Sequence, residues 1–335
     1  MNGTESTIEI FKPFGEAFEL MKKILFQPFD LKKWLVIGFA AFLARLSGGF
    51  SSSFNPFSRW SSQRDQKAIA ESFREMPSVS QMEWWMIGLF VVGGLMILAF
   101  ILAVMWLGAR GRFIFTDCIV HNRGTIVAPW KEFRVQGNSF FLFSLLIAFV
   151  LIVVILIGAV GLIVPFIPRG ADTHPGLGFW IGLSLFAVFV LCLVFGWAVL
   201  SQFMVPIMYR QRCLARHAFT QTASLITANL GPIVLYVLFF LVVTVGATMI
   251  SCAATCVTCC IAAIPYLGTV ILLPIPVTLG AFSLLFLRQF GPDYDVWASF
   301  TPPEFVPILS SAPPIPPPPT SSLNPPPEPP SLPAA

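Results

Sequence analysis

Long uncharged apolar runs limit the folds that are open to this chain. The run from Phe140 to Val164 contains no Asp, Glu, Lys or Arg, and an apolar segment of about 20 residues is what a helix needs to cross a bilayer. Over the whole chain, 56% of the residues are hydrophobic and 11% are charged, whereas about 25% of an average soluble domain is charged. The chain is therefore predicted to be all-α, a polytopic transmembrane helical bundle.

Six runs are apolar enough to predict six spans. We place them at residues 34–50, 84–107, 140–164, 179–208, 233–263 and 266–287. The fourth is longer than a perpendicular helix requires, which predicts tilt or a bend at Pro206, and Pro274 and Pro276 interrupt the sixth. The spans form a membrane domain at residues 34–290, preceded by an amphipathic cytoplasmic segment at residues 1–33. No cleavable signal peptide is expected, because the first apolar run begins only at Trp34, behind a charged segment.

A basic loop between the second and third spans, Gly108–Gly137, predicts the orientation of the protein. It carries five cations and only two acids, Asp117 and Glu132, and loops rich in Lys and Arg stay on the cytoplasmic side during insertion. With this loop inside, the inside segments hold fourteen Lys and Arg residues and the outside segments hold five. We therefore expect a multi-pass protein of the bacterial inner (cytoplasmic) membrane with both termini in the cytoplasm.

Three inside segments share one plan, an amphipathic stretch followed by a break and then by two spans. The first stretch has apolar and charged faces at helical spacing, so it is expected to lie on the membrane surface. The pattern predicts three helical hairpins of common design, and the alternative is that unrelated amphipathic linkers share this appearance. Asn138 and Asn229 are each expected to cap the span that follows. The stretches are Phe14–Leu25, Ile126–Val135 and Leu214–Ile226, and the breaks are Gln27–Asp30, Gly137–Asn138 and Asn229–Pro232.

The last part of the chain, residues 291–335, is predicted to be a disordered cytoplasmic tail. From Thr301 onward it has fifteen prolines, two acids and no cation, so it cannot bury a core and should have polyproline II character. We interpret it as a solvated spacer, and the alternative is a docking ligand for a protein partner.

Several segments together carry a resemblance to known proteins. They are RGRFIFTDC, APWKEF and GNSFFLF in the centre, MVPIMYRQRC after the fourth span and IPYLGTVILLPIP at the sixth. This arrangement resembles a family of uncharacterised bacterial polytopic membrane proteins over roughly residues 8–295. It is also similar, more distantly, to the membrane domain fused to some glycerophosphodiester phosphodiesterases. The resemblance implies no catalytic residue here, because the chemistry of those fusions resides in a separate soluble barrel for which this chain has no room.

The inside cations are the candidate ligands for lipid headgroups. Near an anionic membrane surface each cation contributes about 1 kcal/mol of attraction. The net charge of +4 is small and is concentrated in a few loops, which favours lipid over nucleic acid as a partner. The predicted headgroup contacts are Arg110, Arg112, Arg123, Lys131, Arg134, Arg210, Arg212 and Arg216.

A weak polar cluster, Asp117 and His121, has both a chemical and a structural interpretation. The two residues are four apart, so on a helix they face the same way. They fit a carboxylate-oriented imidazole that acts on a lipid phosphate. They equally fit an ion-pair cluster that holds the loop, which is the interpretation that we favour.

Four cysteines near the end of the fifth span also have two interpretations. Their spacing of three or four residues places them on one helical stripe, and Cys256-x-x-Cys259 has the spacing of a redox or metal motif. We favour close helix packing through small residues, because zinc usually needs four ligands and no histidine lies nearby in sequence. No metal and no cofactor is therefore predicted. The four are Cys252, Cys256, Cys259 and Cys260.

The absence of enzyme motifs favours a non-enzymatic function. The chain has no Gly-rich phosphate loop, HExxH pair or GxSxG elbow. We predict a membrane scaffold or lipid-interacting module that has membrane lipids as partners and no catalytic residue. The first alternative is a permease for a small or lipidic solute that uses Gln202 and the broken sixth span. The second is a lipid-active enzyme at the cytoplasmic interface that uses Asp117 and His121. The sequence makes no prediction of oligomeric state.

Overall fold

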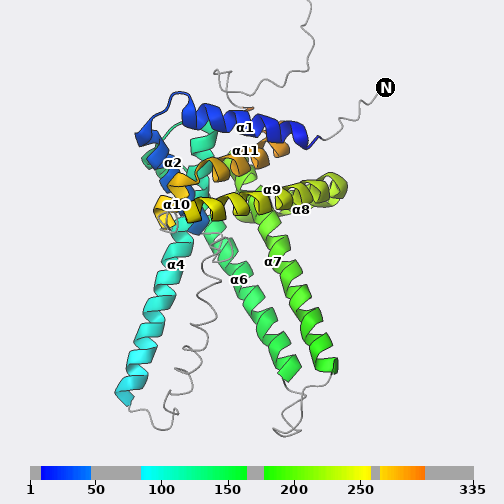
Figure 1. The fold of residues 1–335 in the computed structure, drawn as a ribbon. Helices are drawn as coiled ribbons and strands as arrows, with labels where there is room; N and C mark the ends of the chain where they lie inside the picture. Colours follow the sequence, from blue (N-terminus) through cyan, green and yellow to red (C-terminus); the bar gives the residue numbers. More distant parts are fainter. Residues whose placement is uncertain (1–8, 47–83, 164–176, 258–264, 299–335) are drawn as a thin grey trace, which may run out of the picture.

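Three long helices extend in one direction from a compact head in which the other helices pack together (Figure 1). They are α4 (Trp84–His121), α6 (Arg134–Ile163) and α7 (Leu177–Gln211). The computed structural model describes residues 9–46, 84–163, 177–257 and 265–298, and within these ranges every regular element is a helix. The predicted outside loop at residues 51–83, most of the connection after the third span, and the tail beyond residue 298 lie outside the described residues.

The three long helices are longer than a bilayer is thick. They contain 38, 30 and 35 residues, which at 1.5 Å per residue gives lengths of about 57, 45 and 52 Å, against about 30 Å for the hydrocarbon core. Each helix can therefore cross the membrane and continue into the head. Burial agrees with this division, because the buried residues lie within 108–120 of α4, 136–140 of α6 and 201–209 of α7.

The remaining parts of these helices expose apolar side chains on all sides. On α4, Leu89, Met96 and Phe100 are 67%, 70% and 70% exposed, and the most apolar windows of the three helices have mean hydropathies of 2.8, 3.4 and 2.7. A helix that is hydrophobic all round is typical of a membrane span. With α9 (Leu230–Val257), four described helices are long and apolar enough to cross a membrane, which indicates a membrane protein.

The fourth apolar helix, α9, has a different place from the other three. In the view of Figure 1 it lies across them at the level of the head, next to α8 (Ala215–Ala228). Its first half packs into the head, where the Tyr236 ring contacts Phe203 of α7 at 5.2 Å and Phe286 at 4.3 Å between centroids. Its second half contains no buried residue. The structure thus divides α9 into a half that packs into the head and an apolar half that has no buried residue.

The structure does not confirm the first and sixth predicted spans. The first corresponds to α2 (Leu31–Leu46), whose 16 residues measure about 24 Å, and α2 packs along the head end of α4. The sixth is divided into α10 (Pro265–Ile271) and α11 (Pro274–Arg288), because proline has no backbone N–H with which to continue a helix. The buried residues of α11 run from Val277 to Leu287, so α11 belongs to the core of the head.

The N-terminal helix, α1 (Phe11–Phe26), is amphipathic as predicted, but its apolar face is covered by protein. Ala17, Leu20 and Ile24 are at most 5% exposed, and the Phe14 ring lies 5.7 Å from that of Phe282 on α11. Figure 1 shows α1 along α11, on the side of the head away from the long helices. Much of this apolar face therefore packs on protein, and the location of the helix at the membrane surface stays a prediction.

Two of the three predicted breaks occur where the sequence places them. Asp30 precedes α2, and its Oδ1 accepts a hydrogen bond from the Lys32 backbone N–H at 2.9 Å. Asn229 separates α8 from α9, but it ends α8 by donating from Nδ2 to the Leu225 carbonyl. The third break lies at Phe133, between α5 (Val127–Glu132) and α6. Helix α6 is continuous through Asn138, so the predicted break and cap at that residue are wrong.

Candidate functional site

The segment that the sequence assigns to a central loop is mostly helix. Helix α4 continues fourteen residues beyond the predicted end of the span and stops at His121. Gly108 to Val120 contribute its buried residues, and Gly111 lies so close to α2 that an added Cβ would be 2.5 Å from Leu43 Cβ. Arg110, Arg112 and Asp117 are therefore inside the head rather than on an exposed loop.

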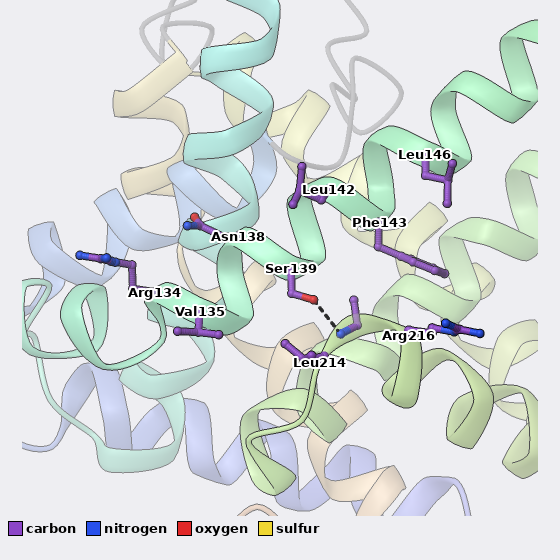
Figure 2. A pocket seen from close by; sticks show the side chains of 10 residues that line it. Arg134, Val135, Asn138, Ser139, Leu142, Phe143, Leu146, Leu214 and Arg216 are labelled. Carbon is purple, nitrogen blue, oxygen red and sulfur yellow. Dashed lines mark hydrogen bonds between the residues drawn. The ribbon is translucent and has the colours of Figure 1, made fainter.

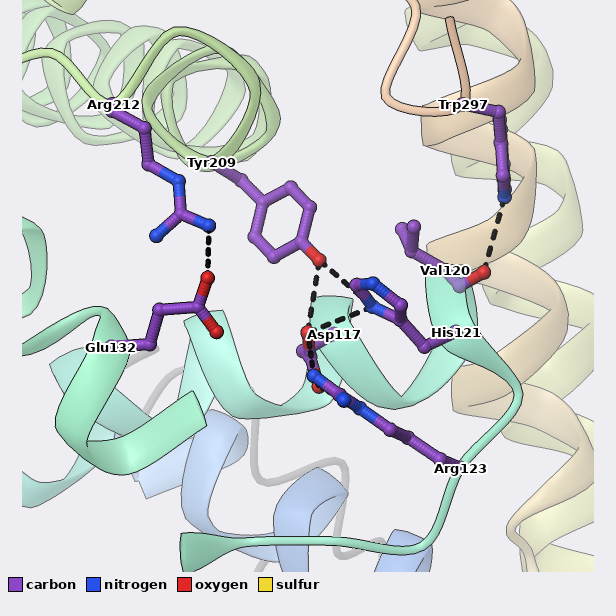
Figure 3. Close-up of polar contacts among 8 residues, drawn as sticks. All are labelled: Asp117, Val120, His121, Arg123, Glu132, Tyr209, Arg212 and Trp297. Carbon is purple, nitrogen blue, oxygen red and sulfur yellow. Dashed lines mark hydrogen bonds and ion pairs between the residues drawn. The ribbon is translucent and has the colours of Figure 1, made fainter. Parts of the chain in front are cut away.

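Asp117 is the centre of a buried polar cluster (Figure 3). Its side chain is 0% exposed, and Arg123 binds it through both Nε and Nη2, each at 3.1 Å. Tyr209 of α7 donates its hydroxyl to Oδ1 at 2.9 Å, and His121 Nδ1 lies 2.9 Å from the same oxygen. The structure thus brings Asp117 and His121 together, as their spacing predicts, and adds Arg123, six positions after Asp117, and Tyr209, which lies 92 positions away.

The contacts of Asp117 favour the structural interpretation of this cluster. A buried carboxylate needs several donors to offset its loss of water, and here Arg123, Tyr209 and His121 surround it. The hydrogen bond to Asp117 also raises the pKa of Arg123 above its usual range. The cluster fixes the end of α4 and the segment after it to the end of α7.

A second ion pair lies beside this cluster and continues into an aromatic stack. Arg212, just after α7, pairs with Glu132 of α5 (Figure 3). The guanidinium carbon of Arg212 lies 4.0 Å from the centroid of the Phe133 ring. Phe133 stacks in turn on Tyr209, with centroids 4.6 Å apart and an interplanar angle of 15°. Both Arg123 and Arg212 are therefore engaged by carboxylates.

Arg110 and Arg112 are held by aromatic rings. The Arg110 guanidinium carbon lies 4.4 Å from the Trp106 ring and 4.9 Å from the Trp130 ring, and Nη2 donates to Asn138 Oδ1 at 2.9 Å. Arg110 is 7% exposed. Arg112 is half-buried, with its guanidinium carbon 5.4 Å from the Phe140 ring. We find these two predicted headgroup ligands inside the packing of the head.

The other four predicted headgroup ligands have no carboxylate within ion-pairing distance among the described residues. Lys131, Arg134 and Arg216 are exposed, and Arg210 is half-buried. All four lie where α6 and α7 enter the head: on α5, at the first residue of α6, near the end of α7 and in the first turn of α8. We call Lys131, Arg134, Arg210 and Arg216 the open cations.

A groove of about 610 Å³ lies between the start of α6 and the start of α8, and we call it the α6–α8 groove (Figure 2). Two of the open cations, Arg134 and Arg216, line it at opposite ends, with Ser139 between them. Ser139 Oγ accepts a hydrogen bond from the Ala215 backbone N–H at 3.0 Å and so joins the two helices. The lining residues are Arg134, Val135, Asn138, Ser139, Leu142, Phe143, Leu146, Leu214, Ala215 and Arg216.

The polar residues that complete these sites were not identified from the sequence. Tyr209 reaches Asp117 across 92 positions of the chain, and Ser139 reaches Ala215 across 76. The only early signal was the basic segment Arg210–Arg216 after the fourth span, which indicated a second surface on the same side of the membrane. It did not indicate which residues would meet.

The residues for which the sequence offers a catalytic, redox or metal-binding interpretation do not form a metal site in the described part of the chain. No group of three or more His, Cys, Asp or Glu residues there has a geometry suited to a metal ion. Cys252 is half-buried and Cys256 is exposed, while Cys259 and Cys260 lie outside the described residues.

Gln202, which the permease alternative invokes, belongs to a buried polar group. Its Nε2 donates to Tyr236 OH at 3.0 Å and to Ser283 Oγ at 2.7 Å. These bonds connect α7, α9 and α11 in the core of the head.

Comparison with known proteins assigns the chain to a family. No curated protein and no solved structure matches the chain, so the more distant likeness to the membrane domain of glycerophosphodiester phosphodiesterases has no support from these comparisons. One family, described as "Family of unknown function (DUF7544)", matches residues 9–296. Since that range covers most of the sequence, the chain belongs to this family.

Proposed function

We propose that the protein is a non-enzymatic membrane scaffold whose head engages anionic phospholipid headgroups. The open cations carry the proposal, because they lie at the head end of α6 and α7 and lack carboxylate partners among the described residues. Cations at this depth attract anionic lipids by about 1 kcal/mol each. Since basic segments stay inside during insertion, the proposal places the head on the cytoplasmic side of the inner membrane, together with both chain termini.

The two alternatives have less support from the geometry. In the enzyme alternative His121 would act on substrate, yet Asp117 is occupied by Arg123 and Tyr209 and is fully buried. In the permease alternative Gln202 would bind a solute, yet its amide donates to Tyr236 and Ser283. In both cases the polar side-chain atoms form hydrogen bonds with other residues of the head.

The proposal is tested by neutralising the open cations together, as Lys131→Gln, Arg134→Gln, Arg210→Gln and Arg216→Gln. The full-length protein is extracted from its membrane in polymer-bounded discs, and the co-extracted lipids are quantified by mass spectrometry. We expect the share of anionic lipid around the protein to fall, because the attraction of the head for negative headgroups is removed.

A matched control removes the same charge elsewhere, as Lys12→Gln, Lys22→Gln, Lys23→Gln and Lys32→Gln. These residues lie on α1 and at the start of α2, and α1 is on the side of the head away from the long helices (Figure 1). The control should retain the lipid composition of the unmodified protein. An unchanged anionic share in the first variant, or an equal fall in both, contradicts the proposal.

A further inference from the structure

We propose that the α6–α8 groove binds one anionic glycerophospholipid from the surrounding membrane. This inference rests on the proposed function and makes it specific, because it assigns the headgroup contact to one site with a defined stoichiometry. Charge is the first argument. The groove is lined by two arginines and by no acid, and neither arginine has a carboxylate within ion-pairing distance in the described ranges. The two arginines flank Ser139 on opposite sides of the groove, and in this structure their guanidinium groups are turned outward (Figure 2).

The hydrogen-bonding groups of the groove are donors, as an acceptor-only phosphate requires. Asn138 Oδ1 accepts from Trp106 Nε1 at 3.1 Å and from Arg110 Nη2 at 2.9 Å. Trp and Arg side chains can only donate, so these contacts fix which way the amide faces and leave the Asn138 NH₂ group for another acceptor. Ser139 Oγ accepts from the Ala215 N–H, which leaves its hydroxyl proton to donate. Phosphate oxygens satisfy both donors.

The apolar part of the groove matches an acyl chain. Leu142, Phe143 and Leu146 follow Ser139 along α6, in the direction of its lipid-facing part. Leu142 is 62% exposed and Leu146 is 55% exposed. The groove is thus cationic and hydrogen-bonding at the head end and apolar toward the bilayer, which is the order of headgroup and chain in a phospholipid. Its volume of about 610 Å³ lies within the roughly 300–1,000 Å³ of typical ligand sites.

The test is native mass spectrometry of the purified full-length protein titrated with phosphatidylglycerol or phosphatidylcholine of identical acyl chains. The unmodified protein should retain one phosphatidylglycerol molecule in preference to phosphatidylcholine. The double variant Arg134→Gln/Arg216→Gln should weaken that binding roughly 30-fold, from the loss of two cations near the phosphate. The matched control, Lys131→Gln/Arg210→Gln, removes two open cations that do not line the groove and should bind as before.

A second pair of variants tests the apolar part. Leu142→Trp fills the groove and should abolish retention of the lipid, whereas Leu156→Trp, at a similarly exposed position of α6 outside the groove, should not. Equal retention of the two lipids, equal weakening in the two arginine and lysine double variants, or binding that survives Leu142→Trp overturns the site. Displacement of the lipid by millimolar inorganic phosphate also overturns it, because a free anion would then be the occupant.

The outcomes separate this site from the proposed function. If the groove variants retain the single lipid as before, but neutralising all four open cations lowers the anionic share in discs, the groove is overturned and the general proposal stands. If the groove variants lose the lipid while that share is unchanged, the groove is supported as a single contact, and the enrichment of anionic lipid by the open cations as a set is contradicted.

Discussion

Two ion pairs that lie close together in the head differ in their surroundings. Asp117 is 0% exposed and is bound by Arg123 through two hydrogen bonds. Glu132 and Arg212 are 45% and 46% exposed. Breaking a buried pair leaves an uncompensated charge and costs about 3–5 kcal/mol, whereas an exposed pair contributes about 0–1 kcal/mol because water screens it. The same type of contact should therefore have very different effects on stability.

We expect Arg123→Gln to destabilise the protein strongly, because Asp117, which is 0% exposed, would lose its counter-charge. Arg212→Gln is the control, since it removes the cation of an exposed ion pair in the same region. Thermal unfolding of the two variants in detergent, followed by circular dichroism, should show a large drop in midpoint for the first and a small one for the second. Equal drops would mean that the burial of Asp117 does not matter for stability.

At the scale of single residues, local contacts could be predicted and distant ones could not. Asp117 and His121 were paired correctly because positions four apart meet on any helix. The contact with Tyr209 depends on how α7 packs against α4, and no local period encodes that arrangement. For the same reason, the sequence could not show which of the predicted headgroup cations pair with a carboxylate, which contact aromatic rings and which stay open. Those differences depend on tertiary neighbours.

At the scale of elements, the sequence marked where the apolar runs end and not where the helices end. The apolar run of α4 stops near Leu107, but the helix continues to His121 because α2 and other head helices bury that part. For α1 the amphipathic pattern was predicted correctly, but a pattern of faces does not say whether membrane or protein covers the apolar one. The division between α10 and α11 followed directly from Pro274 and Pro276.

The close packing of α2 against α4 gives a prediction at Gly111. A Cβ at this position would lie 2.6 Å from the backbone carbon of Leu43 and 2.7 Å from the Ala44 nitrogen, and backbone atoms cannot move aside as a side chain can. We expect Gly111→Ala to lower stability by about 1–3 kcal/mol through overpacking.

Gly94→Ala on the same helix is the control for Gly111→Ala. An added Cβ there meets nothing within 4 Å, so the variant should be neutral or slightly stabilising, because alanine favours helix over glycine by about 1 kcal/mol. Thermal unfolding in detergent again provides the comparison. Similar midpoints for the two variants would contradict close packing between α2 and α4.

At the scale of the whole molecule, α4, α6 and α7 separate two ends that face different surroundings. One end is the head with its ion pairs and open cations. The other end contains Trp84, the first residue of α4, which is 85% exposed. The long apolar segments between these ends are about as long as a bilayer is thick. The proposed orientation therefore predicts that a reagent outside the cell reaches the Trp84 end and does not reach the head.

Cysteine labelling in intact cells tests the orientation. The variant Lys131→Cys introduces a thiol on the exposed surface of the head, and Trp84→Cys introduces one at the far end of α4. An impermeant thiol reagent should label the second variant in intact cells and the first only after permeabilisation, because the head is proposed to be cytoplasmic. Native Cys118 is unsuitable as a reporter, because it is 0% exposed. The reverse labelling pattern would place the head outside.

The bond between Tyr209 and Asp117 also sets an order of events during synthesis. Asp117 leaves the ribosome 92 residues ahead of Tyr209, so the carboxylate lacks this partner during the whole time in which α4 and α6 are made and inserted. Until the last turns of α7 are translated, water has to donate the hydrogen bond that Asp117 later accepts from the Tyr209 hydroxyl. Asp117 can therefore be enclosed only after α7 is made, and the head closes later still, because α11, which contributes to its core, follows α7 in the chain.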